Sequence, residues 1–178
     1  MDINVKKPQF TYEYSCVMLI VSQTIKNMIK KWGLVNISSN MLYINPSCGI
    51  FGFEYNPHLT IKYGIHDENP QHVLQYIQHT GKIVINYGKI SLFDGNPSYD
   101  VVKIDVFGDV LYKMNELITR NVPTTDRYPV YSPHVTIAYI KKGSGKKFIN
   151  DETFDKLTDE VGSALFTSLN GNEYYINL

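Results

Sequence analysis

The chain has 178 residues, of which 43% are hydrophobic and 13% aromatic, and its 17 basic residues balance 17 acidic ones. This composition excludes a disordered chain and is typical of one folded domain with a sizeable core, so we expect residues 1–178 to form a single domain. A protein that holds long nucleic acid by its phosphates usually carries a basic excess, so the zero net charge favours a small ligand over a duplex or a long strand.

Strands and helices are predicted in alternation along the first half of the chain. Ser22 can cap a helix whose apolar residues recur at i, i+3, i+4 and i+7, and Gly33 is expected to end it. A second helix is expected to start at Asn69-Pro70, a cap followed by proline, and to close at Gly81. Strands are expected where β-branched and aromatic residues gather, at residues 12–21, 50–55 and 58–65.

The second half of the chain predicts a similar order. Residues 82–93 and 100–107 predict two strands, and Gly108-Asp109 opens an amphipathic helix that ends before Pro123. The elements expected after it are a strand, a short helix and one or two further strands, at residues 135–140, 151–162 and the tail to Leu178. The two halves therefore look like copies of one unit. They predict an α+β fold of two lobes, in which two antiparallel β-sheets face each other across a central cleft with helices outside.

One seven-residue motif occurs once in each half. Residues 57–63 read PHLTIKY and residues 133–139 read PHVTIAY, with five of the seven positions identical. Side chains alternate along a strand, so each copy is expected to turn a histidine and a threonine to one face, roughly 6–7 Å apart. The residues expected on that face are His58, Thr60 and Lys62 in the first copy and His134, Thr136 and Ala138 in the second. The residues expected on the opposite, core-packing face are Leu59, Ile61, Tyr63, Val135, Ile137 and Tyr139.

Two such faces brought together predict a site that cleaves a phosphoester. Histidine exchanges protons near neutral pH, so His58 and His134 can act as base and acid on opposite sides of a phosphate. The hydroxyls of Thr60 and Thr136 can donate hydrogen bonds to its non-bridging oxygens. This chemistry needs no metal, and the remaining histidines lack the spacing of metal ligands, so we expect no metal and no cofactor.

Paired His-x-Thr strands, one in each half of a small duplicated domain, resemble the 2H phosphoesterase superfamily. The resemblance implies that His58 and His134 are the acid and base and that Thr60 and Thr136 hold the phosphate. It also implies metal-independent attack on phosphoesters that bear an adjacent ribose hydroxyl, through or from a 2′,3′-cyclic phosphate.

Within that superfamily the chain looks most like the viral branch, the phage anti-CBASS nucleases that degrade cyclic di- and trinucleotide immune signals. The resemblance implies that an N-terminal tyrosine and a late glutamate assist, and Tyr12 and Glu173 are the nearest positions. Each has an ordinary alternative, because Tyr12 also fits a core strand aromatic and Glu173 a solvated edge residue. Lys62, on the predicted face of His58, is a further hypothesis for a phosphate contact.

We therefore expect a metal-independent phosphodiesterase that cleaves 3′–5′ linkages of small cyclic oligonucleotides by 2′-hydroxyl attack, as viral counter-defence. One alternative is an RNA-end enzyme that opens 2′,3′-cyclic phosphates or forms 2′–5′ links. Another is a nucleotide-binding sponge without turnover. Base preference, ring size and oligomeric state stay open.

The cysteines and apolar segments predict a cytoplasmic protein, in the host cytoplasm if the source is viral. Cys16 and Cys48 are the only cysteines and give no disulfide framework; Cys16 lies in an apolar run and is expected in the core. The longest apolar run, from Cys16 to Val21, is far too short to span a bilayer, so no membrane partner is expected.

Overall fold

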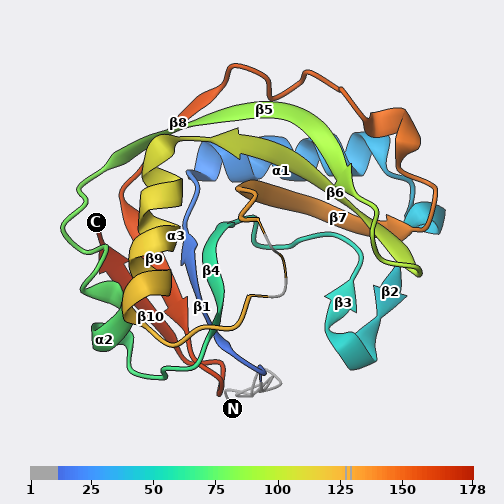
Figure 1. The fold of residues 1–178 in the computed structure, drawn as a ribbon. Coiled ribbons are helices and arrows are strands. Elements are labelled where there is room, and N and C mark those ends of the chain that lie inside the picture. Colours follow the sequence, from blue (N-terminus) through green and yellow to red (C-terminus); the bar gives the residue numbers. More distant parts are fainter. Residues whose placement is uncertain (1–11, 127, 129) are drawn as a thin grey trace, which may run out of the picture.

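A curled antiparallel sheet organises the molecule, as a computed structural model that describes residues 12–126, 128 and 130–178 shows (Figure 1). Its strands, in their order across the sheet, are β10 (Glu173–Asn177), β9 (Ser163–Thr167), β1 (Ser15–Leu19), β4 (Leu59–Ile65), β7 (His134–Lys141), β6 (Tyr99–Phe107), β5 (Ile83–Phe93) and β8 (Thr158–Val161). We call β10-β9-β1-β4 the first lobe and β7-β6-β5-β8 the second lobe, so each lobe carries one copy of the motif. The α+β fold class and its two-lobed form are confirmed, with the two predicted sheets joined edge to edge through β4 and β7.

Two long helices pack against the motif strands in a crossed arrangement. Helix α1 (Gln23–Asn36) follows β1 of the first lobe but packs against β7, while α3 (Asp109–Asn121) follows β6 of the second lobe but packs against β4. The smaller elements are α2 (Pro70–Leu74), the 3-10 turns Ser39–Met41, Pro46–Cys48 and Lys146–Phe148, and a two-stranded sheet of β2 (Ile44–Asn45) and β3 (Ile50–Phe51). The crossed helices tie each lobe to the other. No helix in the described part of the chain is long and apolar enough to cross a membrane.

The helix starts follow the sequence, but two of the predicted ends do not. The Ser22 side chain caps α1 by accepting from the Ile25 N–H at 3.3 Å, as expected. Gly33 does not end the helix: it is buried inside α1, where a Cβ would lie 3.2 Å from the Phe53 ring and 3.4 Å from the Ile137 side chain of β7, so this glycine allows close packing. Asn69 caps α2 as predicted, yet the helix proper ends at Leu74, well before the predicted stop.

Residues 151–162 do not form the predicted helix. They form turns that lead into β8, because the last four residues before Gly162 pair with the edge of β5. Asp159 of β8 accepts hydrogen bonds from the Ser22 N–H at 2.8 Å and from the Tyr87 hydroxyl at 3.3 Å. A single residue, Gly162, then separates β8 from β9, so the chain passes directly from one end of the sheet to the neighbour of the other end. The tail forms two strands, as expected.

Candidate active site

The two motif strands meet at one pair of residues. In the antiparallel pairing of β4 with β7, Leu59 lies opposite Val135, and both side chains are fully buried in the core. Because directly opposite residues in a sheet share a face, the residues on either side of this pair also face each other and point away from that core. By this register they are the two histidines and two threonines, His58 opposite Thr136 and Thr60 opposite His134. We call the face that carries them the site face.

Beyond this pair the two strands part, and other segments take up their free edges. Along β7, the Tyr43 N–H donates to the Tyr139 carbonyl at 3.0 Å and the Tyr139 N–H donates to the Gly52 carbonyl at 2.7 Å. Along β4, the Thr125 N–H donates to the Gly64 carbonyl at 2.8 Å. The four motif side chains therefore lie at the point where the two lobes diverge.

Both motif strands carry a β-bulge at the same position, immediately after the threonine. On β4, Thr60 pairs with Met18 and Lys62 pairs with Val17, so Ile61 has no partner in that register. On β7 the matching residue without a partner is Ile137, between Thr136 and Ala138. An inserted residue reverses the alternation of side chains beyond it.

Because of the bulges, the last two residues of each motif lie on the opposite faces from those that strict alternation predicts. Lys62 does not share the face of His58: it lies on the core face, 3% exposed, and its Nζ donates to Asp126 at 2.5 Å. Its counterpart Ala138 is likewise fully buried, while Tyr63 and Tyr139 are half-buried on the side of the threonines. The premise for a phosphate contact by Lys62 is therefore wrong.

Both imidazoles are held in the same way. The Nδ1 of His58 lies 2.9 Å from the Asn56 carbonyl, and the Nδ1 of His134 lies 2.7 Å from the Ser132 carbonyl. A carbonyl only accepts, so each Nδ1 carries a proton and each Nε2 is left to exchange one. In each copy a proline separates the two partners and keeps the residue before it extended, which aims the carbonyl at the ring two residues later.

A charged cluster surrounds His134 on the second lobe. In the register of β6 with β7, Lys103 lies opposite Thr136 and Asp105 lies opposite His134. Lys103 is 4% exposed; its ammonium donates to the Ser91 hydroxyl at 2.7 Å and to the Asp105 carboxylate. The Phe93 ring joins the two parts, since its centroid lies 4.4 Å from the Lys103 ammonium and 4.7 Å from the His134 ring.

This environment favours the neutral form of His134. Burial lowers the pKa of His134, its hydrogen bond to Ser132 raises the pKa, and the nearby charges of Lys103 and His58 lower it further. Asp105 raises the pKa slightly, but together with the Ser132 hydrogen bond it does not outweigh burial and the two positive neighbours, so the pKa of His134 is lowered. The neutral imidazole of His134 is therefore the form that is ready to accept a proton.

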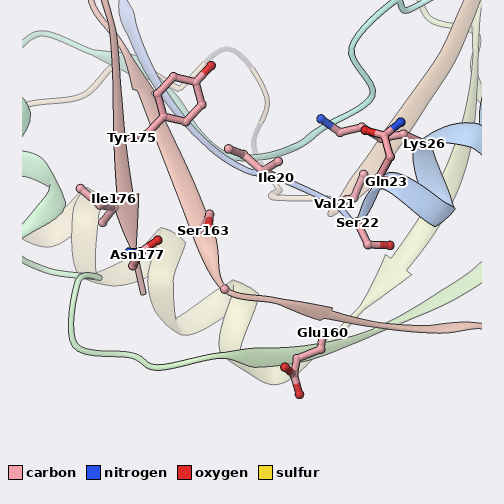
Figure 2. Close-up of a pocket in the computed structure, with 11 residues that line it drawn as sticks. Ile20, Val21, Ser22, Gln23, Lys26, Glu160, Ser163, Tyr175, Ile176 and Asn177 are labelled. Carbon is pink, nitrogen blue, oxygen red and sulfur yellow. The ribbon is translucent and has the colours of Figure 1, made fainter.

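A cavity lined by both apolar and polar residues lies beside the His58 ring. A cavity of about 180 Å³ is lined by Met18, Ile20, Lys26, Asn56, His58, Leu165 and Tyr175. Ile20, Lys26 and Tyr175 also line a wider cavity of about 590 Å³ between the start of α1 and the strands β9 and β10 (Figure 2). The Lys26 ammonium donates to the Asn56 side chain at 2.8 Å, and Asn56 in turn holds His58. The site thus opens from His58 toward the C-terminal strand.

The two remaining sequence candidates lie in different places. The strand register places Glu173 on the site face. Glu173 of β10 pairs with Thr167 of β9, Thr167 pairs with Cys16 of β1, and Cys16 pairs with Tyr63 of β4, which lies on that face. Its carboxylate accepts from the Tyr175 hydroxyl at 2.8 Å. Tyr12 lies beyond the Ser15 end of β1, whereas the other end of that strand, at Leu19, pairs with Leu59. The Tyr12 side chain is 46% exposed rather than in the core, and the structure does not bring it to His58.

Three residues of the site face were missed in the sequence, and one was misjudged. Lys103 and Asp105 alternate with apolar residues on β6, which is the available signal for a polar row on a central strand. Tyr175 lies on β10 among mostly exposed residues, so neither residue type nor alternation marks it in the sequence. Cys16, expected in the core, is half-buried on the site face beside Thr60, and burial raises the pKa of its thiol to about 12. The described residues contain no group of three acidic, histidine or cysteine side chains that could hold a metal ion.

Solved structures share this fold over nearly the whole chain. E. coli LigT, complexed with 3′-AMP, is 12% identical, with a TM-score of 0.60 over 97% of this chain and 96% of LigT. The protein TT0787 of Thermus thermophilus is 13% identical, with a TM-score of 0.59 over 93% of this chain and 94% of that protein. A protein described as a phosphoesterase is 14% identical, with a TM-score of 0.61 over 96% of each chain. No family model matches the chain, and no curated protein matches it significantly. The chain therefore has the fold of LigT.

Proposed function

We propose that this protein is a metal-independent phosphodiesterase that cleaves 3′–5′ linkages of cyclic di- or trinucleotide immune signals, as viral counter-defence in the host cytoplasm. The observation that carries the proposal is the β4–β7 pair, which sets two histidines and two threonines around one point, each imidazole bound through Nδ1. The fold of LigT, seen with 3′-AMP and with phosphate, supports a nucleotide phosphoester as the substrate.

In the proposed reaction, a ribose 2′-oxygen attacks the adjacent phosphorus and the bond to the leaving 5′-oxygen breaks. One histidine takes the proton of the 2′-hydroxyl and the other gives a proton to the 5′-oxygen, which leaves a 2′,3′-cyclic phosphate. The lowered pKa of His134 favours it as the base of this step, with His58 as the acid. The two histidines then exchange roles while water opens the cyclic phosphate.

The site also supplies hydrogen bonds and charge for the phosphoryl oxygens. The hydroxyls of Thr60 and Thr136 flank the two imidazoles, and the Lys103 ammonium lies next to Thr136 in the register. Donors fixed before the reaction stabilise the extra negative charge of the transition state without reorganisation. Each positioned acid or base typically adds a factor of about 10²–10⁴ to the rate.

A second candidate function is an enzyme of RNA ends that opens 2′,3′-cyclic phosphates or forms 2′–5′ links. The observation in its favour is that LigT, which has this fold, holds a mononucleotide with a 3′-phosphate. The zero net charge of the chain counts against a substrate as long as a transfer RNA. A sponge without turnover is the third reading, and it has no need of two imidazoles bound in the same way.

The test is turnover of a substrate panel by the wild-type protein and matched histidine variants. Cyclic dinucleotides, cyclic trinucleotides and 2′,3′-cyclic mononucleotides are incubated in EDTA, and the products are separated by chromatography. We expect cleavage by the wild type, near-complete loss in His58→Ala and in His134→Ala, and full activity in the control His79→Ala, whose exposed ring has a hydrogen bond with the neighbouring Gln78. Linkages without a free 2′-hydroxyl should resist. Turnover that survives both site variants refutes the mechanism, and cleavage of cyclic mononucleotides alone favours the RNA-end enzyme.

A further inference from the structure

One row of side chains links the candidate site to the C-terminal strand. Across the first lobe, Thr60 pairs with Met18, Met18 with Leu165, and Leu165 with Tyr175. Directly opposite residues in an antiparallel sheet point to the same face, so Tyr175 lies on the site face, three strands from Thr60. The row places an aromatic ring at the outer edge of the face that carries His58.

The row has an apolar floor with an exposed ring at its end. Leu165 is 3% exposed, whereas Tyr175 is 60% exposed on the last strand of the sheet. Leu165, Met18 and Ile20 line the cavity beside His58 together with Tyr175. An exposed aromatic ring beside these apolar side chains is suited to a flat ligand, because both faces of the ligand then leave water.

The orientation of Tyr175 is fixed by its neighbour two residues earlier. The Tyr175 hydroxyl donates to the Glu173 carboxylate at 2.8 Å, and this hydrogen bond is the main reason that the pKa of Tyr175 is raised. The tyrosine therefore stays protonated at neutral pH and keeps the bond. This contact with the Tyr175 hydroxyl is compatible with a positioning role for Glu173.

Polar side chains line the two cavities as well, and we call them the polar rim. Lys26 lines both cavities and its ammonium is held by Asn56, while Gln23 and Ser163 line the wider one (Figure 2). A nucleobase combines a flat apolar face with hydrogen-bonding edges, which matches an apolar floor, an aromatic ring and a polar rim. The hollow begins at His58, where the proposed scissile phosphate is held, so a base attached to that phosphate through its ribose falls on this side.

We infer that Tyr175 is a stacking platform for one nucleobase of the substrate, in the cavity beside His58, and that Glu173 positions its ring. This inference rests on the proposed function and adds to it the side of the site on which a base binds. Stacking depends on the π-face that every base has, so Tyr175 contributes affinity for nucleotides of any base, and the polar rim is left to discriminate between them.

The experiment measures the affinity of two ligands for tyrosine variants by calorimetry. Adenosine 3′-monophosphate carries a base and inorganic phosphate does not. In Tyr175→Ala we expect binding of the nucleotide to weaken about five- to hundredfold, with phosphate binding unchanged. Tyr175→Trp should restore nucleotide binding, Tyr175→Phe should weaken it less than alanine does, and Glu173→Gln, which keeps an acceptor oxygen, should perturb it less than Glu173→Ala.

The matched control is Tyr174→Ala on the same strand. Tyr174 is 41% exposed, yet it points to the opposite face, where its ring packs 6.2 Å from Phe166. We expect this variant to bind both ligands as the wild type does. The inference is overturned if Tyr175→Ala keeps its nucleotide affinity, if Tyr174→Ala loses as much, if phosphate binding falls in parallel, or if the wild type binds no nucleotide.

Turnover separates this inference from the proposed function. A wild type that cleaves no member of the substrate panel but binds the nucleotide through Tyr175 contradicts the function and supports the stacking site. A wild type that cleaves the panel, with Tyr175→Ala unchanged in KM and in nucleotide affinity, supports the function and contradicts the stacking site.

Discussion

Replacing Lys103 by methionine tests whether the charged cluster of the second lobe takes part in the chemistry. Methionine keeps most of the length and apolar contact of the side chain while it removes the ammonium. Met18 pairs with Thr60 in the first lobe as Lys103 pairs with Thr136 in the second, so the variant makes the two lobes alike at this position.

The expected loss follows from the position of the charge. For the proposed complex we place the phosphoryl group about 5 Å from the Lys103 ammonium, because Lys103 lies opposite Thr136 and such side chains are in contact distance. A phosphodiester gains about one negative charge when a deprotonated oxygen attacks it. With an effective dielectric constant of about 20, one unit charge about 5 Å away contributes about 3 kcal/mol, or about 10²-fold in kcat. Lys103 is 4% exposed, so screening by solvent reduces this figure little.

The assay is single-turnover cleavage of the best substrate of the panel across a pH series. Lys103→Met should lower kcat about 10²-fold with a smaller change in KM. It should also move the acidic limb of the pH profile to higher pH, because the Lys103 charge is one of the causes that lower the pKa of His134. A purely structural role of Lys103 would not move that limb.

Two controls make the result interpretable. Lys62→Met removes another buried lysine, one that pairs with Asp126 on the core face, and should leave kcat unchanged. The double variant Lys103→Met/Asp105→Asn removes both charges and shows whether an unpaired Asp105 causes the loss. If Lys103→Met keeps kcat within threefold of the wild type, or if the double variant recovers full activity, the reasoning is refuted.

Two further predictions concern His134 and the backbone of β4. Burial lowers the pKa of His134 below the ordinary histidine value of about 6.5. If His134 is the base, kcat/KM of the wild type should therefore stay constant as the pH decreases to that value and fall only at lower pH. An acidic limb with its midpoint above about 6.5 contradicts the assignment. Gly64→Ala should lower the free energy of unfolding by more than about 2 kcal/mol in denaturant titrations, because Gly64 has φ +87° and a Cβ would lie 2.0 Å from the Thr125 carbonyl oxygen. Gly95→Ala, with no atom within 4 Å, is its control and should change that free energy little, so equal losses in the two variants would contradict the steric explanation.

Local sequence signals predicted the features that depend on neighbours in the chain. Ser22 and Asn69 cap their helices through their own side chains, and the motif strands form where they were expected. The order of elements and the repeated motif were enough to predict two lobes. The meeting of His58 with His134 at one strand pair follows from that duplication, although the duplication alone does not give the register.

Features that depend on partners distant in the chain could not be predicted. The bulges at Ile61 and Ile137 arise from how β1 and β6 pair with the motif strands, so strict alternation placed Lys62 on the wrong face. Lys103 and Tyr175 reach the site only through pairing across the sheet. Gly33 is a glycine inside α1 because the Phe53 ring leaves little room for a side chain, and a pattern of single residues does not report such contacts.

The shared bulge also accounts for where the two copies of the motif differ in chemical character. Six of the seven positions hold identical or closely similar residues, and the exception is Lys62 against Ala138. This is the first residue after the bulge that lies on the core face, and its surroundings differ between the copies. The Lys62 ammonium pairs with Asp126, whereas the backbone of Ala138 bridges to Phe53 and its side chain is fully buried. Local packing therefore decides the identity of this one position: exchanging the two residues between the copies would leave Asp126 without its cation and bury an ammonium without a partner in place of Ala138.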